Sequence, residues 1–218
     1  MMDELSTLQR ISVWALPVIF AITVHEVAHG WVALKLGDST AKMLGRLTLN
    51  PIKHIDPLGT IVVPGILIFL GGFIFGWAKP VPVNWENLKQ PRRDMALVAL
   101  AGPFANLIMA IMWAILMGIG LNLSESPQSW IYPLVLMGQA GILINIILMV
   151  LNLLPILPLD GGRVLGAMLP VSIAQKYALL ENYGLFIVLA LLYFGVLSAL
   201  LSPPVNMLRG IMYQLAGI

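Results

Sequence analysis

Residues 23–37, TVHEVAHGWVALKLG, place His25, Glu26 and His29 inside one of the most apolar segments of the chain. Ionisable side chains are expensive to keep in hydrocarbon, and those found within membrane-spanning segments usually serve a function. Two properties of the remaining sequence therefore matter most: whether the surrounding segment crosses a membrane, and which other polar groups could join these three.

The composition indicates an integral membrane protein. Of the 218 residues, 59% are apolar and only 10% are charged, whereas about a quarter of the residues in a soluble domain are charged. The chain has no cysteine, which excludes disulfides and thiolate ligands, and no nucleic-acid-binding motif is present. The N-terminal residues MMDELSTLQR lack the basic start and cleavage site of a signal peptide, so we expect the first apolar segment to be retained. We expect a single integral membrane domain over residues 1–218.

Four apolar runs are long enough to cross about 30 Å of hydrocarbon as helices, which takes roughly twenty residues. They cover residues 11–36, 95–121, 131–154 and 184–201, the last ending before a Ser-Pro-Pro sequence. A fifth apolar segment, residues 58–78, carries a proline and several glycines that permit a re-entrant hairpin. The predicted fold is an all-α polytopic membrane protein with about four transmembrane helices and one re-entrant element. Five to six transmembrane helices are the alternative.

The basic residues predict the orientation. Of the 12 lysines and arginines, ten lie in three regions, at Lys35, Lys42, Arg46 and Lys53, at Lys79, Lys89, Arg92 and Arg93, and at Arg163 and Lys176. By the positive-inside rule these regions face the cytoplasm of a cell membrane. The links 37–57 and 79–94 share that side only if residues 58–78 enter and leave by the same face, with the N-terminus outside. A true crossing of residues 58–78 is the alternative.

The HEVAHG sequence has the spacing of a zinc site. Residues four apart project from nearly the same face of a helix, so His25 and His29 can offer two imidazoles to one ion. Glu26 is turned away by about 100° and can instead reach a water bound to that ion. The HExxH motif therefore supplies two zinc ligands and a general base. The alternative, two histidines hydrogen-bonded within a helix bundle, leaves the buried Glu26 unexplained.

A catalytic zinc normally takes three protein ligands and one water. We predict that Asp160, in NLLPILPLDGGR (residues 152–163), is the third ligand. The prolines of this stretch should stop the preceding helix, and its two glycines should let the backbone turn, so that the carboxylate is held without a helix around it. Asp160 also falls on the predicted cytoplasmic side with the histidines. We interpret the remaining histidine, His54, as an exposed loop residue.

The chain resembles the site-2 protease family, zinc metalloproteases that cleave transmembrane helices within the bilayer. HEVAHG matches the first motif of that family, NLLPILPLDGG the second, and GPFAN (residues 102–106) a third. The resemblance implies that one zinc ion is bound by His25, His29 and Asp160 and that Glu26 is the base. It also implies that Asn152 helps to position the substrate and that Asn106 lines the site. The expected partners are transmembrane helices of substrate proteins and the lipid bilayer.

No PDZ-like or nucleotide-sensing module accompanies these motifs, so the resemblance is to a minimal form, and the short chain favours a prokaryotic source. Residues 76–85, GWAKPVPVNW, alternate two valines with two prolines. Since proline in a sheet belongs on an edge strand, we predict a small β-hairpin region on the cytoplasmic side, whose edge pairs with an extended substrate. A proline-stiffened connector is the alternative.

Two other functions fit intramembrane histidines. A metal transporter would ordinarily have internal repeats and a polar path through both halves of the membrane, whereas the polar groups here gather toward one side. An inactive relative that binds transmembrane helices without cutting them is opposed by the intact Glu26 and the full ligand set.

Overall fold

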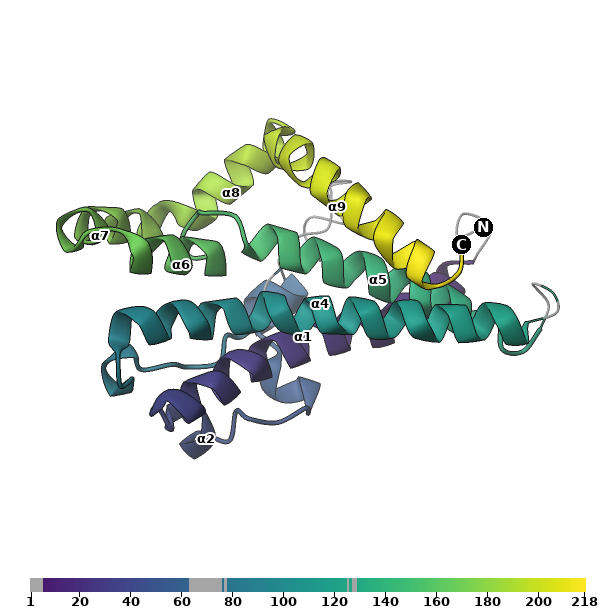
Figure 1. Ribbon diagram of the computed structural model, residues 1–218, viewed down its shortest axis with the longest axis horizontal. Coiled ribbons are helices and arrows are strands. Elements are labelled where there is room, and N and C mark those ends of the chain that lie inside the picture. The colour runs from purple at the N-terminus through teal and green to yellow at the C-terminus, as the bar shows by residue number, and fades with distance from the viewer. Residues whose placement is uncertain (1–5, 63–75, 77, 125, 127–128) are drawn as a thin grey trace.

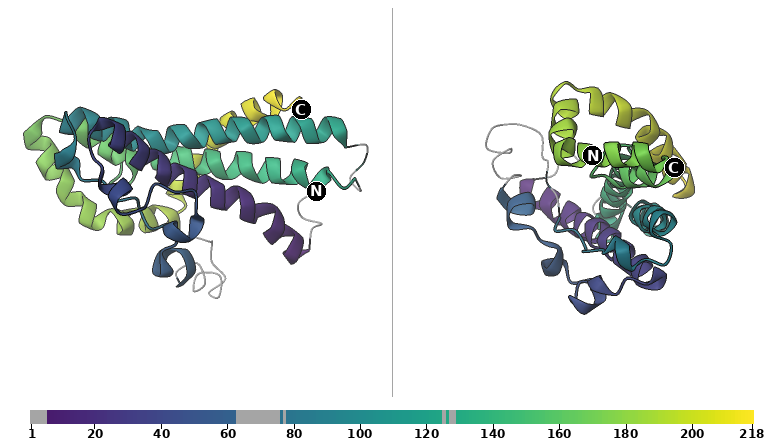
Figure 2. Two further views of the ribbon diagram at one scale, coloured as in Figure 1. Left: turned by 90° about the horizontal axis from the view of Figure 1, so that it is seen from below. Right: turned by 90° about the vertical axis from the view of Figure 1, so that its left-hand side faces the viewer.

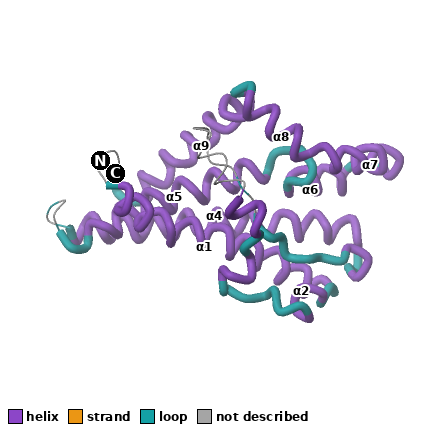
Figure 3. Tube along the Cα trace, turned by 180° about the vertical axis from the view of Figure 1, so that it is seen from behind, coloured by secondary structure: helices purple, strands orange, loops and turns teal. Residues whose placement is uncertain are grey.

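The computed structural model describes residues 6–62, 76, 78–124, 126 and 129–218, and this part of the chain is helical with no strand (Figures 1 and 3). The long helices are α1 (Thr7–Leu36), α4 (Pro91–Leu123), α5 (Tyr132–Asn152) and α9 (Val196–Leu215). The shorter α-helices are α2 (Thr40–Met43), α6 (Asp160–Met168), α7 (Val171–Ala178) and α8 (Gly184–Tyr193). Single turns form η2 (Pro51–His54), η3 (Pro57–Val62), η4 (Trp85–Asn87) and η5 (Leu179–Tyr183).

Four helical stretches of the described chain are long and apolar enough to cross a membrane. Three of them, α1, α4 and α5, coincide with the predicted spans 11–36, 95–121 and 131–154. The fourth is Val171–Tyr193, which comprises α7, η5 and α8. A helix of 30 residues such as α1 is about 45 Å long, which exceeds the hydrocarbon thickness of roughly 30 Å.

The predicted fourth span, residues 184–201, is wrong as a single helix. The chain leaves α8 after Tyr193, and Gly195 takes a left-handed conformation with φ of 73°, which glycine adopts without a Cβ clash. The α9 helix then begins at Val196 and continues through Pro203 and Pro204 instead of stopping before them. The Ser202 hydroxyl, which donates to the Ser198 carbonyl at 2.6 Å, is the kind of side-chain bond that lets an apolar helix tolerate proline.

The core lies where α4, α5 and α9 meet, as Figure 1 shows. Its buried residues are Ala110, Ala114, Met117, Val135, Ile142, Ile146, Val205, Met212 and Ala216. Alanines and glycines allow the backbones to approach closely, which is how helices without a hydrophobic driving force between them gain packing energy. Both α1 and α6 also pack against α4, so α4 is the element that brings residues near position 25 together with residues near position 160.

The predicted β-hairpin region is not supported. Residues 78–84 form neither helix nor strand, although Lys79 and Val81 each precede a proline, which restricts them to extended conformations. Pro80 and Pro82 carry no N–H and cannot donate to a ladder. Three other N–H groups of the segment bond elsewhere: Lys79 N–H to the His54 carbonyl at 2.9 Å, and Val81 N–H to Glu26 and Asn84 N–H to Asp38, both at 2.8 Å. The segment is thus an extended connector held mainly by side chains.

Asp38 anchors this connector to the end of α1. Its fully buried carboxylate accepts bonds from Thr40 at 2.5 Å, from Asn84 N–H and from the Asn87 side chain. Burial by itself raises the pKa of Asp38, but the hydrogen bonds from Thr40, Asn87 and Asn84 outweigh it and lower the pKa below its usual value. The carboxylate form is therefore the one that stabilises the fold.

The described part of the α1–α4 connection lies on one side of the long helices, and α8 and α9 lie on the opposite side (Figures 1 and 2). The N-terminal end of α1 and the α4–α5 connection lie at one end of the molecule, and α6 and α7 lie at the other (Figure 1). Most of the segment 58–78, predicted to re-enter or cross, lies outside the described residues.

Candidate metal centre

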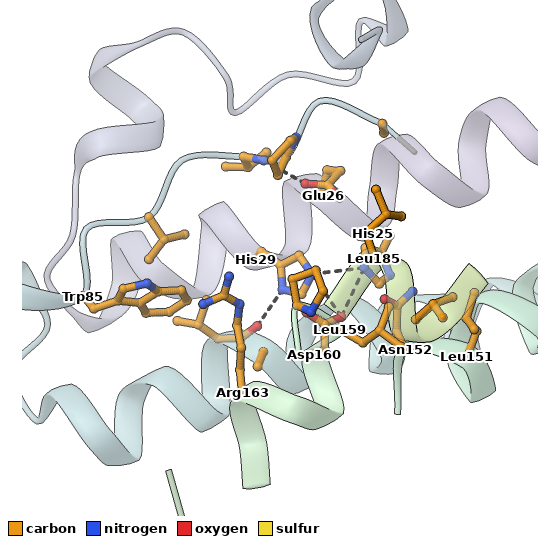
Figure 4. Close-up of a pocket in the computed structure, with 18 residues that line it drawn as sticks. His25, Glu26, His29, Trp85, Leu151, Asn152, Leu159, Asp160, Arg163 and Leu185 are labelled. Atoms are coloured by element: carbon orange, nitrogen blue, oxygen red, sulfur yellow. Dashed lines mark hydrogen bonds and ion pairs between the residues drawn. The ribbon is translucent and has the colours of Figure 1, made fainter. Parts of the chain in front are cut away.

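The structure brings His25, His29 and Asp160 together (Figure 4). The Nε2 atoms of the two histidines lie 3.0 Å apart, and Asp160 Oδ2 lies 3.3 Å from His25 Nε2 and 3.4 Å from His29 Nε2. The histidines come from successive turns of α1, as their spacing predicts. Asp160 comes from α6, well over a hundred residues later in the chain.

The outer nitrogens of both imidazoles are held by oxygen atoms of α4. His25 Nδ1 lies 2.5 Å from Asn106 Oδ1, and His29 Nδ1 lies 2.7 Å from the Val98 carbonyl. Asn106 Nδ2 donates to the Ala21 carbonyl and to Asn145 Oδ1, which orients the amide so that its oxygen faces His25. Since both Nδ1 atoms face acceptors, the proton of each neutral ring belongs on Nδ1 and the Nε2 lone pairs point at Asp160. Such outer bonds are typical of metal-ligating histidines.

The three facing atoms fit a zinc ion. With zinc–ligand bonds of about 2.0–2.1 Å, the ligand atoms of a tetrahedral site are about 3.3 Å apart, and the triangle observed has sides of 3.0, 3.3 and 3.4 Å. Asp160 Oδ2 is buried and has no hydrogen-bond donor among the described residues. Two imidazole lone pairs and a carboxylate oxygen this close repel one another unless a proton or a cation lies between them, so the donor set is one that a metal cation would fit.

Gly102 makes room for this cluster. A Cβ atom at this position would lie 2.5 Å from His25 Cε1 and from His29 Nε2, which is well inside ordinary contact. The glycine of GPFAN is therefore the point at which α4 passes directly beneath both imidazoles. Asn106, one turn further along α4, supports His25 from the same helix, so one short motif supplies both space and orientation.

The backbone around Asp160 differs from the prediction. The preceding helix ends at Asn152, as expected, but Asp160 is the first residue of α6 and not part of an irregular turn. The following glycines lie within this helix. Gly161 passes directly against the Leu153 and Leu154 carbonyls, so a small residue is needed there for close packing of the helix on the preceding turn, and not for a sharp bend.

The cluster opens into a cavity of about 650 Å³, lined by the three ligands together with Glu26, Asn152 and Arg163. Glu26 points from α1 toward the connector 78–84, on the other side of the histidines from Asp160 (Figure 4), and its Oε2 accepts the Val81 N–H at 2.8 Å. The arrangement is a metal site with a carboxylate beside it and an accessible volume in front.

The other predicted residues are placed as follows. Asn152 lines the cavity, and its amide donates to the Leu148 carbonyl of its own helix. Asn106 does not line the cavity: it is fully buried behind His25 and contacts the ligand instead. The interpretation of His54 as exposed is wrong, because it is 3% exposed and its Nε2 bonds the Thr48 carbonyl. His54 is the last residue of η2, which packs against α1, and it is not among the residues of the metal cluster.

Three groups that contact the site residues were not predicted from the sequence: Asn145, the Val98 carbonyl and the Val81 N–H. Asn145 is fully buried within α5, and a polar residue in an apolar run is itself a signal of function. The other two are backbone groups, whose roles no residue type reveals.

Comparison with known proteins agrees with this geometry. The family model Peptidase family M50 matches residues 13–139 and 119–195. "Putative zinc metalloprotease YwhC" of Bacillus subtilis is 40% identical over 193 residues, covering 87% of this chain and 84% of that protein. "Putative zinc metalloprotease Rip2" of Mycolicibacterium smegmatis is 30% identical over 195 residues, covering 87% and 71%.

"Zinc metalloprotease MJ0392" of Methanocaldococcus jannaschii is 26% identical over 204 residues, covering 89% of this chain and 47% of that protein. The comparison with solved structures found no match. The protein is a zinc metalloprotease, as the family match, the two relatives aligned over most of their length and the donor set together indicate. Its apolar helices indicate a multi-pass membrane protein. The chain belongs to peptidase family M50, the site-2 protease family.

Proposed function

We propose that the protein is an intramembrane endopeptidase that hydrolyses peptide bonds within transmembrane segments of other membrane proteins. The observation that carries the proposal is the depth of the ligands in a membrane-length helix. His25 is eleven residues from the C-terminal end of α1, or about 16 Å along the axis, and about 27 Å from its N-terminal end. A metal site at that position in a spanning helix lies below the membrane surface.

Zinc bound by His25, His29 and Asp160 would activate a water molecule and polarise the scissile carbonyl. Glu26 takes a proton from that water as its oxygen adds to the carbonyl carbon. When the C–N bond breaks, the same carboxyl group delivers the proton to the leaving amine. Asn106 and the Val98 carbonyl keep both imidazoles in the ligating orientation throughout.

The cavity supports a transmembrane substrate. One part of its wall is apolar, formed by Leu151 of α5 and by Leu185 and Val188 of α8. Val83, on the connector, also lines the cavity, and its N–H and C=O make no hydrogen bond within the described residues. An unwound substrate segment can pair with these groups as an added strand, which satisfies backbone groups that would otherwise be unpaired in a dry site.

The charge distribution supports the proposed orientation. Basic residues gather in the links near α2, the start of α4, and α6 and α7, and by the positive-inside rule this favours a cytoplasmic location for this end of the molecule. The metal centre then lies toward the cytoplasmic side of the plasma membrane, where water has a short path to it.

Replacement of Glu26 by Gln tests the proposed chemistry. The amide keeps the size of the side chain and leaves the three ligands in place, so we expect zinc content to stay at the wild-type level. An amide cannot accept the proton, so cleavage of a transmembrane substrate in proteoliposomes should fall by about 10²–10⁴-fold. Glu86→Gln, at an exposed position in η4, is the matched control and should cleave like the wild type.

Undiminished cleavage by the Glu26→Gln protein would remove the base from the mechanism. Wild-type proteoliposomes that move zinc across the bilayer but cut no substrate would favour a transporter. A wild-type protein that retains bound substrate and never cuts it would favour an inactive helix-binding relative.

A further inference from the structure

The Glu26 carboxylate is held by the backbone of a distant segment. Its Oε2 accepts the Val81 N–H at 2.8 Å, and its Oε1 has no hydrogen-bond partner among the described residues. The two oxygens of the proposed base therefore differ: one is tied to the connector, and the other receives no bond from the part of the chain that the structure describes. Figure 4 shows this bond on the side of the cavity opposite Asp160.

The connector 78–84 is built to present a single donor at this point. Pro80 and Pro82 flank Val81 and have no N–H of their own. The buried Arg46 donates to the Lys79 carbonyl at 2.9 Å and to the Pro80 carbonyl at 3.3 Å. These bonds fix the chain just before Val81.

Two further bonds fix the segment at its ends. Lys79 N–H donates to the His54 carbonyl at 2.9 Å, and Asn84 N–H donates to the anchored Asp38 carboxylate at 2.8 Å. His54 itself is buried at the end of η2, and its Nε2 bonds the Thr48 carbonyl. The Val81 N–H thus lies in a short, doubly anchored span with little freedom to move away from Glu26.

Gly30 permits the close approach. A Cβ atom at Gly30, the last residue of HEVAHG, would lie 2.8 Å from Val81 Cγ1 and 2.6 Å from Leu47 Cδ2. The buried Val81 side chain therefore rests on α1 one turn beyond Glu26, and that contact sets the height of its N–H beside the carboxylate.

We propose that the Val81 N–H is a positioning group for the general base, an inference that rests on the proposed function. By holding Oε2 it fixes the rotamer of Glu26 and leaves Oε1 available to the water that zinc, held by His25, His29 and Asp160, would activate. A hydrogen bond to a charged acceptor is stronger and more directional than a neutral one. Without it the carboxylate samples several rotamers, and misplacement of a catalytic group by about 1 Å can cost about 10²-fold in rate.

The test replaces Val81 by the α-hydroxy acid with the same side chain, which converts the Pro80–Val81 amide to an ester. The exchange removes the N–H and also weakens the Pro80 carbonyl, which accepts the longer of the two Arg46 bonds. We expect kcat on a transmembrane substrate to fall by about 10–100-fold, with KM changed by less than about twofold. Zinc content and the visible spectrum of the cobalt-substituted protein should match the wild type, because no ligand is touched.

Three comparison variants separate positioning from general damage. The same ester at Val83 removes a donor that does not contact Glu26, so it should raise KM and keep kcat. Gly30→Ala should push Val81 away from Glu26 by a steric clash while keeping its N–H, so it should also lower kcat with zinc retained. Gly210→Ala, with open space around its Cβ, should cleave like the wild type.

The results that overturn the inference differ from those that overturn the proposed function. Cleavage by the Val81 ester at the wild-type kcat, or a loss of kcat accompanied by loss of zinc or an altered cobalt spectrum, would show that the bond is structural. A wild-type protein that binds zinc and cuts no substrate would instead refute the proposed function itself.

Discussion

Gly102→Ala should weaken zinc binding strongly, although it adds only one methyl group. It adds one methyl group to α4 at a point where the new atom would lie 2.5 Å from His25 Cε1 and from His29 Nε2, and 2.6 Å from His25 Nε2. To restore an ordinary contact of about 3.4 Å, the imidazoles or α4 must move by about 0.9 Å.

That movement is large on the scale of a zinc site. Ligand distances in a working site lie within about 0.2 Å of their ideal values, and both rings are tied from behind to Asn106 and Val98, so they cannot retreat without breaking those bonds. Disturbance of outer bonds alone typically costs about 10–100-fold in metal affinity, or about 1.4–2.7 kcal/mol. We expect at least this loss for Gly102→Ala, with cleavage reduced in parallel.

The assay is competition for zinc with a chelator of known affinity, on protein in detergent, alongside the thermal unfolding of the metal-free form. Gly210→Ala is the matched control, since it makes the same change in the interior of α9 with nothing within 4 Å of the new atom. If Gly102→Ala binds zinc within about twofold of the control, the short distances between α4 and the imidazoles, on which the fit to zinc was judged, would be refuted.

Three further predictions address the third ligand, the topology and the anchor of the connector. Asp160→Ala should lose zinc and cleavage together, whereas His54→Ala should keep zinc and lose only thermal stability; metal analysis showing the reverse would assign the wrong third ligand. Because the chain has no cysteine, a cysteine at Lys42 should react with an impermeant thiol reagent only from the cytoplasm and one at Ser126 only from outside, and labelling of both from one side would overturn the orientation. Asp38→Asn should reduce the free energy of unfolding by about 1–3 kcal/mol at neutral pH. The folded-state pKa of Asp38 is lowered, so the difference from the wild type should vanish as pH falls from about 4 through the lower folded-state pKa, and a difference that persists at low pH would contradict this account.

Local geometry explains why part of the site could be predicted from the amino-acid order. The spacing of His25 and His29 requires only that residues 23–37 be helical, because one helical turn then places both rings on one face. The apolar runs around α1, α4 and α5 were long enough to identify three of the candidate spans without any knowledge of packing. Asp160 was found because its motif and predicted depth agreed.

The same local signals gave wrong predictions where a feature depends on contacts with segments far away in the sequence. Alternating prolines and valines favour an edge strand. Within the described residues, however, segment 78–84 bonds to the side chains of Glu26, Asp38 and Arg46 and to the His54 carbonyl, and it pairs with no strand. His54 lies in a link with several polar residues and is nevertheless buried, because η2, which it ends, packs against α1. The break at Gly195 likewise reflects a backbone conformation that glycine permits but does not require.

The amino-acid order therefore determines which groups can bind a metal ion, and the packing of α1 and α6 on α4 determines that they do so together. Asn106 contacts His25 across 81 positions of the chain, and Val98 contacts His29 across 69. No periodicity records pairings at such separations, because they arise only when two helices pack in one register. The Val81 N–H belongs to the same class: a backbone donor is identical at nearly every residue, and only the tertiary structure decides which one meets Glu26.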